Sequence, residues 1–441
     1  MILKRLFAAS LIWMLLSVPI AAQDAPAYAL DNMIIHNSDG SVTDSGTLVW
    51  RDGVIESVGS NVEIPYDAYV IDGGDSLHVY PGFIDGLGMW GMPDPESPER
   101  VDDPGNPGYD RAGVQPHRSA SDHLDTESEK LESAMKAGIL TANIGLKGYM
   151  LPGQPDIFFL NGEQTEDHLF MESTGYQFAF EEAPGGWSNR AFPSTLMGVM
   201  AQFRQLMYDA VALQDHLRYF AAAEGAIQAP QRNKVLESLF PVMSGEKKLM
   251  AVVDSPENLE RLLKLKNELG FVTTLVSGKE LYRHAETLAE MDIPVLASIE
   301  LPEKPGWMKE SDEDEESNTE EEVSEEEEAF RERQRQAWEA MAQNIRTLID
   351  AGVKVGFSSS GLAAGELHET ARNLTEDGGL TEQEVLQIMT SNTAEILGRS
   401  AAIGSLRAGS IASFSVFDAP FFDEEASVHM AISNGVIHEL D

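Results

Sequence analysis

The sequence contains no cysteine among its 441 residues. This absence excludes disulfide bonds, thiolate chemistry and a lipid anchor attached through cysteine. Basic residues are also few, because 31 Lys and Arg stand against 73 Asp and Glu, and the formal net charge is −42. Nucleic acids and anionic membrane surfaces both require a basic patch, so neither is an expected partner. The acidity itself favours solubility and identifies no substrate.

Histidine is present but scattered along the chain. The ten histidines show neither a His-x-His nor a His-x-x-x-His spacing, although such spacings commonly place two imidazoles on one metal ion. His117 and His123 form the closest pair and lie in a polar segment beside Arg118. The sequence therefore contains no local histidine motif for a metal.

The first 22 residues have the pattern of a secretory signal peptide. Lys4 and Arg5 provide the positive region, residues 6–20 the apolar region, and residues 21–22 a small-residue cleavage site before Gln23. The alternative is a membrane anchor, but the apolar run is shorter than the roughly 20 residues of a spanning helix. We therefore expect a periplasmic or secreted protein without membrane contact after cleavage.

Short alternating segments broken by turns occupy both ends of the remaining chain. Residues 47–50 and 54–58 flank an Asp-Gly turn, as the strands of a hairpin do. Residues 411–416 and 429–438 have the same β-rich character. We predict that residues 23–80 and 398–441 form one small composite β-sandwich.

Between these ends, apolar strands alternate with amphipathic helices. Ser255 is a suitable helix N-cap, Pro256 suits the first helical position, and Gly270 ends the pattern. Such alternation predicts an α/β fold with a parallel sheet, closed here as a (β/α)8 TIM-type barrel over residues 81–397. The expected strands are residues 248–253, 271–276, 294–299 and 354–357, and the expected helices are 256–269, 280–291 and 330–351.

One segment of the barrel region is unusually acidic. Between residues 310 and 328, 13 of 19 residues are Asp or Glu, and few apolar side chains remain to be buried. We predict a disordered insertion at about residues 307–329. It follows a strand that ends near residue 299, so it is either an acidic flap over the barrel mouth or a solvated insertion.

Several motifs, in a consistent order, resemble the amidohydrolase superfamily. Pro81-Gly-Phe-Ile-Asp85 resembles its first barrel strand, and Ala137-Gly-Ile-Leu-Thr141 resembles its entry to the second strand. Residues 46–59, 390–398 and 404–418 are similar to its N-terminal strands, its last helix and its return to the sandwich. The most similar group is the imidazolonepropionase-like exported amidohydrolases. The resemblance implies a (β/α)8 barrel with a composite β-sandwich.

The resemblance also implies a metal centre, from which this sequence departs. Active members hold zinc or another divalent metal through a His-x-His pair after the first strand, histidines on later strands and an Asp on the last strand. The corresponding positions here are Leu87, Met89, Val252 and Ser360. None provides the imidazole or carboxylate that such a metal requires. We therefore predict no metal cofactor, and a structural role for Asp85.

Three interpretations of function follow. In the first, the chain is a catalytically degenerate amidohydrolase, a pseudoenzyme that acts as a binding or partner subunit beside an active relative. In the second, it cleaves an amide or cyclic amide through a non-standard metal or carboxylate site. In the third, it binds a small molecule at an apolar mouth near Leu87, Met89 and Trp90.

The second interpretation has four candidate catalytic residues. They are His117, His123, Glu181 and Glu182, whose side chains suit general acid and base catalysis. His117 and His123 either lie near the barrel mouth or are polar loop residues that cap the following helix. The two glutamates follow a predicted strand.

Overall fold

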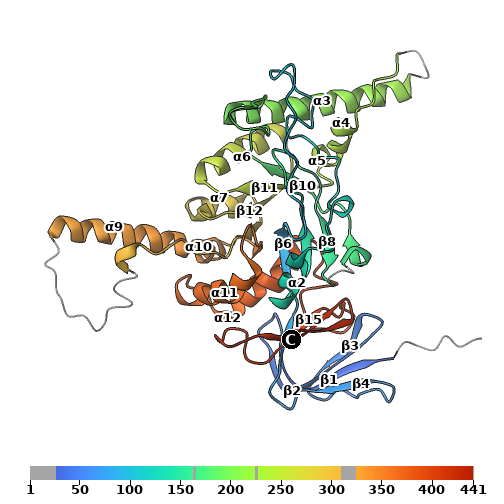
Figure 1. The fold of residues 1–441 in the computed structure, drawn as a ribbon, viewed down its shortest axis with the longest axis vertical. Helices are drawn as coiled ribbons and strands as arrows, with labels where there is room; N and C mark the ends of the chain where they lie inside the picture. The colour runs from blue at the N-terminus through green and yellow to red at the C-terminus, as the bar shows by residue number, and fades with distance from the viewer. Residues whose placement is uncertain (1–25, 162–164, 224–226, 309–323, 441) are drawn as a thin grey trace, which may run out of the picture.

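The computed structural model describes residues 26–161, 165–223, 227–308 and 324–440. The predicted signal segment and residues 309–323 of the predicted insertion lie outside the described residues. An all-β layer lies at one end of the molecule, and the long helix α3 (Leu196–Ala222) lies at the other (Figure 1). Within the described ranges, no helix combines the length and the apolar character needed to cross a membrane.

Strands from both ends of the chain pair within one sheet. They are β1 (Tyr28–His36), β2 (Val42–Arg51), β3 (Val54–Gly59), β4 (Tyr69–Asp72), β5 (His78–Pro81), β15 (Phe414–Phe417), β16 (Val428–Ser433) and β17 (Val436–Glu439). Their order is β17-β16-β15-β5-β1-β2-β3, with β4 paired to β1. β5 is parallel to β1 and antiparallel to β15, with Pro81 opposite Phe414. The predicted hairpin is confirmed, because β2 and β3 are antiparallel neighbours.

A second sheet of five parallel strands occupies the middle of the molecule. Its strands are, in order, β10 (Tyr176–Ala179), β11 (Leu249–Val253), β12 (Thr273–Ser277), β13 (Val295–Ala297) and β14 (Val355–Phe357). Helices α6 (Pro256–Leu269) and α7 (Ala285–Glu290) connect successive strands, so the predicted β-α alternation is confirmed here. Ser255 caps α6 by accepting from the Asn258 N–H, and Gly270 ends it with a φ of 77°.

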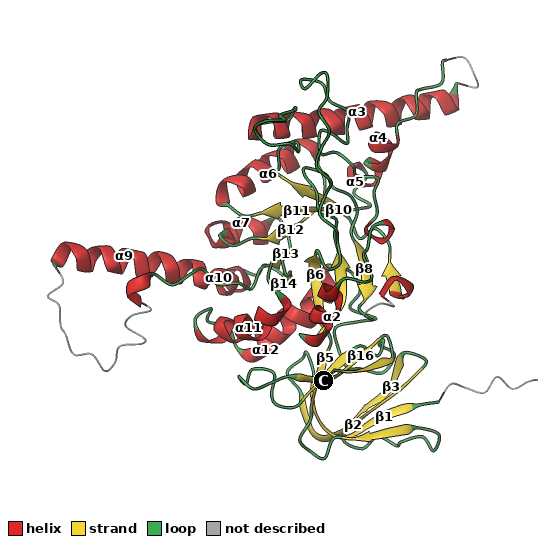
Figure 2. Cartoon of the chain, viewed as in Figure 1, coloured by secondary structure: helices red, strands yellow, loops and turns green. Residues whose placement is uncertain are grey.

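The third sheet departs from a regular barrel. Its strands are, in order, β6 (Phe83–Gly88), β7 (Ile139–Ile144), β8 (Asp156–Phe159) and β9 (Leu169–Met171). β6 and β7 are parallel, but β8 is antiparallel to both of its neighbours. Among the described residues, the predicted barrel is therefore not one continuous sheet. β6 nevertheless lies beside β14, and Figure 2 shows these two strands close together.

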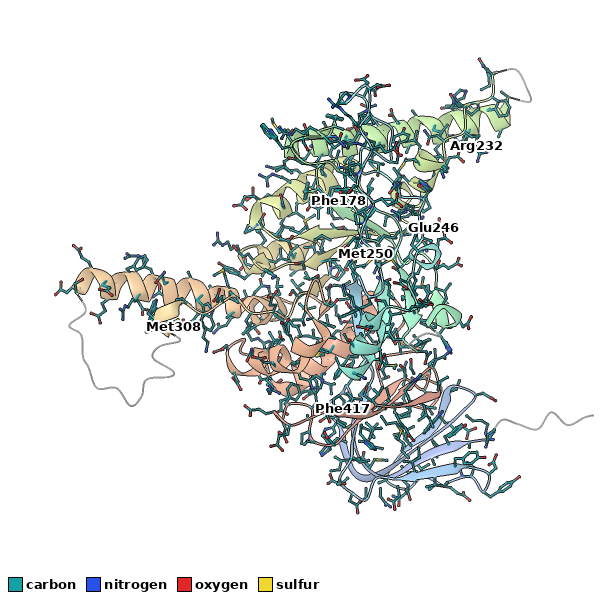
Figure 3. The ribbon with its side chains drawn as sticks, viewed as in Figure 1. Phe178, Arg232, Glu246, Met250, Met308 and Phe417 are labelled. Carbon is teal, nitrogen blue, oxygen red and sulfur yellow. The ribbon has the colours of Figure 1, made fainter. Side chains whose placement is uncertain are left out.

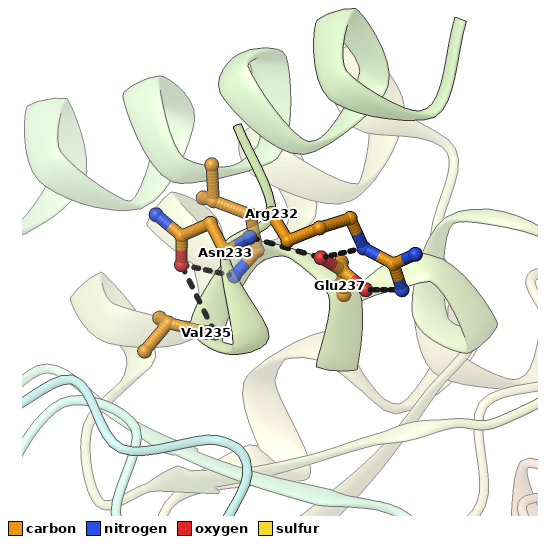
Figure 4. Close-up of polar contacts among 5 residues, drawn as sticks. Arg232, Asn233, Val235 and Glu237 are labelled. Carbon is orange, nitrogen blue, oxygen red and sulfur yellow. Dashed lines mark hydrogen bonds and ion pairs between the residues drawn. The ribbon is translucent and has the colours of Figure 1, made fainter. Parts of the chain in front are cut away.

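Helices cover the two central sheets. The buried side chains of α3 lie between Val199 and Ala210 and include Phe203 and Met207. Before α4 (Lys234–Ser238), the Asn233 side chain accepts from the first N–H groups of the helix, and Arg232 pairs with Glu237 (Figure 4).

The other α-helices are α2 (Glu129–Lys136), α5 (Phe240–Met243), α10 (Asn344–Asp350), α11 (Leu367–Glu376), α12 (Glu382–Gln387) and α13 (Thr393–Ile396). Short helical turns are η1 (Ala120–Asp122), η2 (Thr165–His168), η3 (Leu281–His284), η4 (Ala364–Glu366) and the π-helical η5 (Ile388–Asn392).

The predicted disordered insertion at residues 307–329 is wrong at its C-terminal end. Helix α9 (Glu325–Ala342) begins there, and it projects from the body of the molecule (Figure 1). Ser324 caps it, and four glutamates occupy its first turn, where the helix dipole favours acidic side chains. At the other end of the segment, the Trp307 indole donates to Gln334 of α9 at 3.0 Å. The prediction considered repulsion among the acidic residues and neglected this favourable position.

Candidate functional site

The end of β6 is organised by the carboxylate of Asp85, which is fully buried. Its Oδ1 accepts from the backbone N–H groups of Leu87 at 3.1 Å and Ser359 at 3.0 Å. Its Oδ2 accepts from the indole Nε1 of Trp90 at 2.7 Å. Since Ser359 follows β14, Asp85 both fixes the turn after β6 and links it to the neighbouring strand.

The surroundings of Asp85 affect its charge state in two opposite ways. Burial raises the pKa of Asp85, because the charged form loses its hydration. The hydrogen bonds from Ser359, Trp90 and Leu87 oppose this shift, because they stabilise the carboxylate. Three donors already use the lone pairs of this carboxylate, which leaves little capacity for a metal ion or a substrate.

Two of the positions implied to hold metal ligands belong to an apolar cluster instead. Leu87, with 2% of its surface exposed, packs with Met250, Val276 and Leu296, and Val252 lies against them. Side chains from β6, β11, β12 and β13 therefore meet here. Figure 3 shows Met250 near the centre of the molecule. We call these five residues the central apolar cluster.

The other two implied positions, Met89 and Ser360, offer no stronger ligand. Met89 is partly buried against the main hydrophobic core. Ser360 has a φ of 35°, and its Oγ lies 2.8 Å from that of Ser358. Ser358 donates its own hydroxyl proton to the Leu87 carbonyl at 2.7 Å, so Ser360 is the donor between the two hydroxyls. Among the described residues, no imidazole or carboxylate forms a hydrogen bond with either hydroxyl, so neither serine has a base beside it.

Buried polar side chains near the cluster were not among the predicted site residues. Asn143 donates to the Gly86 carbonyl at 2.8 Å and accepts from the Thr174 hydroxyl at 2.8 Å. Gln177 accepts from the Leu146 N–H at 2.7 Å and donates to the Leu146 carbonyl at 3.2 Å. These side chains join β7 to β6, and β10 to the chain after β7. The sequence signal was a single polar residue within a short apolar strand, which does not distinguish a functional group from a structural one.

A cavity of about 720 Å³, here called the mouth cavity, opens beyond the C-terminal ends of three strands. Residues 92–101 follow β6, residues 146–149 follow β7, and Pro184 follows β10, and all of them line it. Arg118 and His123 also line the mouth cavity, and the Arg118 Nε donates to the His123 Nε2 at 3.2 Å. The predicted candidate His123 is thus found at the strand ends.

The two candidate histidines lie in a positively charged environment. Burial and the charge of Arg118 lower the pKa of His123, and Asp122 opposes them. The pKa of His117 is lowered mainly by burial and to a smaller extent by the positive charges of Lys234 and Arg118. Both shifts favour the neutral form of the imidazole. His117 does not line the mouth cavity, and its buried Nδ1 has no hydrogen-bond partner in the described part of the chain.

The candidate glutamates lie apart from this cavity. Glu181 and Glu182 follow β10, are exposed, and do not line the mouth cavity. Within the described ranges, no group of three or more His, Asp and Glu side chains is arranged to hold a metal ion. The structure therefore does not bring the four candidate catalytic residues together at the cavity.

Comparisons with known proteins agree with this architecture. A model of the amidohydrolase family matches residues 296–437. The structure is similar to that of an amidohydrolase from Thermotoga maritima MSB8, with a TM-score of 0.73 and 20% sequence identity over 93% of this chain and 99% of that chain. The resemblance to the amidohydrolase superfamily is confirmed.

Two further amidohydrolase-type structures are similar in fold. One is a prolidase complexed with N-methylphosphonate-L-proline, with a TM-score of 0.53 and 14% identity over 94% of this chain and 100% of that chain. The other is a putative prolidase from Bifidobacterium longum, with a TM-score of 0.50 and 15% identity over 94% of this chain and 95% of that chain. No curated protein sequence matches the chain.

The amidohydrolase metal centre does not fit the residues that occupy the corresponding positions. Zinc requires imidazole, carboxylate or thiolate ligands at about 2 Å. Leu87 and Val252 have no lone pairs, and the thioether of Met89 is a soft ligand poorly matched to zinc or manganese. The Ser360 hydroxyl already donates to Ser358. Metal-assisted hydrolysis at this place is therefore unsupported by the side chains present.

Proposed function

We propose that this amidohydrolase-fold protein has lost the ancestral hydrolysis of C–N bonds and acts by binding a small molecule or a partner protein. The central apolar cluster is the observation that carries the proposal. Metal-assisted hydrolysis generates a bound hydroxide and a charged transition state. Both are disfavoured where Leu87, Val252 and Val276 replace polar groups with hydrocarbon.

The proposal includes a TIM-type barrel over residues 81–397 and a composite β-sandwich from residues 23–80 and 398–441. The link from Asp85 to Ser359 supports barrel closure, because it joins the first strand of the region to the last. The amidohydrolase neighbours are of TIM-barrel type, which supports the same architecture. The pairing of β5 with β15 supports the composite layer.

Export to a periplasm or secretion is also part of the proposal. Its support is the pattern of residues 1–22, with basic residues, an apolar run and a small-residue cleavage site. Mass spectrometry of the protein recovered from the periplasm or medium tests it. A mature N-terminus at or near Gln23 is expected, and an intact N-terminus in the cytoplasmic fraction would contradict it.

Metal analysis of purified protein tests the loss of the metal centre directly. The protein is purified without chelators, equilibrated with zinc and manganese, and passed over a desalting column. We expect far less than one metal ion per chain, because the implied ligand positions carry no imidazole or carboxylate. One or more tightly retained zinc or manganese ions per chain would refute the proposal.

A second candidate function, cleavage of an amide through a non-standard site, is favoured by one observation. The mouth cavity retains space for a ligand beside the imidazole of His123. This alternative predicts turnover on a panel of imides, lactams and dipeptides, with loss of turnover in His123→Ala, His117→Ala or Glu181→Gln. The pseudoenzyme proposal instead predicts no turnover, with thermal stabilisation by a ligand that is recovered unchanged.

A further inference from the structure

Charge is distributed unevenly around the mouth cavity. Two of its cations lie deep, because Arg111 is only 6% exposed and the Lys147 side chain only 26% exposed, whereas Arg100 is exposed at the rim. Arg118 is half-buried in the same wall. The carboxylates that line the cavity are exposed at its rim, namely Asp94, Glu96, Glu99 and Asp110. A chain with a net charge of −42 thus has a locally positive cavity floor.

Arg118 is the notable cation, because its guanidinium donates only to neutral side chains among the described residues. Its Nη1 donates to Gln115 Oε1 at 3.0 Å, and its Nε donates to His123 Nε2 at 3.2 Å. Among the described residues, no carboxylate forms an ion pair with it. Burial lowers the pKa of Arg118, which reflects lost hydration of the guanidinium. A partly desolvated cation without a counter-charge is costly, and a bound anion removes that cost.

The backbone holds Arg118 in place before any ligand arrives. The Arg118 N–H donates to the Gln115 carbonyl at 3.1 Å, and the Arg118 carbonyl accepts from the Gln154 N–H at 2.9 Å. Arg111 fixes the neighbouring loops, since it donates to the carbonyls of Glu99, Pro184 and Asn189. A preorganised guanidinium loses little entropy when it binds a planar anion.

We propose that the mouth cavity binds a small organic carboxylate, with its carboxylate on Arg118 and Lys147. Lys147 now pairs with Asp94 at 2.6 Å, but Asp94 is 87% exposed, so a ligand carboxylate can replace it. Leu146 and Tyr149 line the same cavity and suit the apolar part of the ligand. The volume of about 720 Å³ fits a small molecule, and the acidic rim repels polyanions such as nucleic acids. This inference rests on the proposed function, because it names the ligand class of that binding protein.

Isothermal titration calorimetry of the full chain with three probes tests the inference. The probes are N-acetyl-L-phenylalanine, its neutral primary amide and phenyl phosphate. We expect the acid to bind at least about tenfold more tightly than the amide, because only the acid forms charge-assisted hydrogen bonds with Arg118. Equal affinities for acid and amide, or no binding of the acid, would overturn the proposal. Tighter binding of phenyl phosphate would overturn the assignment of a carboxylate.

Variants of Arg118 separate a direct contact from a structural role. Arg118→Gln should weaken binding of the acid at least about tenfold and leave binding of the amide unchanged. Arg118→Lys should restore part of the lost affinity, because it retains the charge. Arg335→Gln, on the projecting helix α9, is the matched control and should change nothing. Unaltered binding of the acid by a folded Arg118→Gln protein would refute the contact.

The same titration distinguishes failure of this inference from failure of the proposed function. Proton NMR of the mixtures detects any acetate released from N-acetyl-L-phenylalanine. Release of acetate would contradict the pseudoenzyme proposal but leave the Arg118 contact intact. Absence of acid binding without acetate release would contradict only the ligand class.

Discussion

Around Asp85, a carboxyl group is accommodated deep inside the protein by a small number of contacts. Burial of an unpartnered carboxylate is costly, and Leu87, Ser359 and Trp90 each supply one donor. Gly88 provides the space, because a Cβ at this position would lie 2.1 Å from Asp85 Oδ2 and 2.5 Å from the Trp90 indole nitrogen. The carboxylate and the indole therefore depend on each other.

Asp85→Asn should destabilise the protein by about 1–3 kcal/mol, the usual cost of leaving a buried donor unsatisfied. The new amide keeps one acceptor oxygen but turns an N–H group toward the indole N–H of Trp90. Trp90→Phe removes that second donor, so Asp85→Asn should cost less in the Trp90→Phe background. Urea unfolding of the four proteins in this cycle measures the difference. Fully additive costs would show that the two side chains are not coupled.

For individual residues, the sequence predicted the missing metal ligands better than the contacts that the replacing residues form. Leu87, Met89, Val252 and Ser360 were identifiable because the surrounding motifs align them with the implied ligands. The contact between Asp85 and Trp90 was not predictable, because it depends on the path of the turn between them. The same holds for Asn143, whose partners come from distant parts of the chain.

Between β1 and β5, two histidine rings lie side by side. The His36 Nε2 and His78 Nδ1 atoms are 2.9 Å apart, and the His36 ring stacks on Tyr80 with a centroid distance of 4.4 Å. The pKa of His36 is lowered to about 4, mainly by burial and to a smaller extent by the neighbouring His78. The negative charge of Asp44 opposes this shift. Burial also lowers the pKa of His78, and the negative charge of Asp423 opposes this shift. This strand pair is therefore suited to neutral imidazoles.

The stability of this sheet should depend on pH. A lowered histidine pKa means that the unfolded chain takes up the proton before the folded chain does. Folding stability is therefore fully present above pH 6.5 and declines between pH 6.5 and about 4, by at most about 1.4 kcal/mol per pH unit for each proton. Urea unfolding between pH 7.5 and 5 should show a shallower decline for His36→Gln than for wild type. His216→Gln, at an exposed position on α3, is the control, and an equal change of slope in both variants would contradict the assignment to His36.

Helix boundaries could be predicted from the sequence where a strong local capping signal marks them. The predicted cap of α6 at Ser255 is confirmed, and a similar local signal, the capping box of Thr381 and Glu384, begins α12. β8 and β9 were not predicted, because their antiparallel pairing depends on partners rather than on local periodicity. The start of α9 was missed for a different reason, because the charge of its first turn was interpreted without the helix dipole.

Across the whole molecule, the excess of acidic residues makes like-charge repulsion a general property of the surface. The net charge of −42 is spread over 441 residues, and most ion pairs of the described residues involve partly exposed side chains. Exposed pairs contribute little to stability, and their number does not offset the repulsion. Screening by salt is therefore expected to favour the compact state.

Raising NaCl from about 0.05 M to about 0.5 M should increase Tm by several degrees, because the screening length falls from about 14 Å to about 4 Å. Differential scanning calorimetry measures the change. Choline chloride at the same ionic strength should give an equal increase, because screening does not depend on the identity of the cation. An increase confined to one metal cation would instead indicate a specific cation site.

For the whole molecule, the sequence predicted that the two ends of the chain share one β-layer. It did not predict that the central strands form two separate sheets. The turn signals and alternating patterns mark strands at both ends, and the motif order places them together. The separation into a five-stranded and a four-stranded sheet depends on the chain between residues 145 and 175, where β8 reverses direction. Local sequence patterns do not encode such a reversal.

The antiparallel pairing of β5 with β15 constrains the order in which the protein folds. The paired residues Pro81 and Phe414 are about 330 positions apart, so loop closure between them is among the slowest events available to the chain. Until the last residues have been synthesised, one edge of β5 remains open and can pair with another chain. A product that ends before β15 lacks this partner permanently. The C-terminal strand β15 thus covers this edge of β5 in the folded protein.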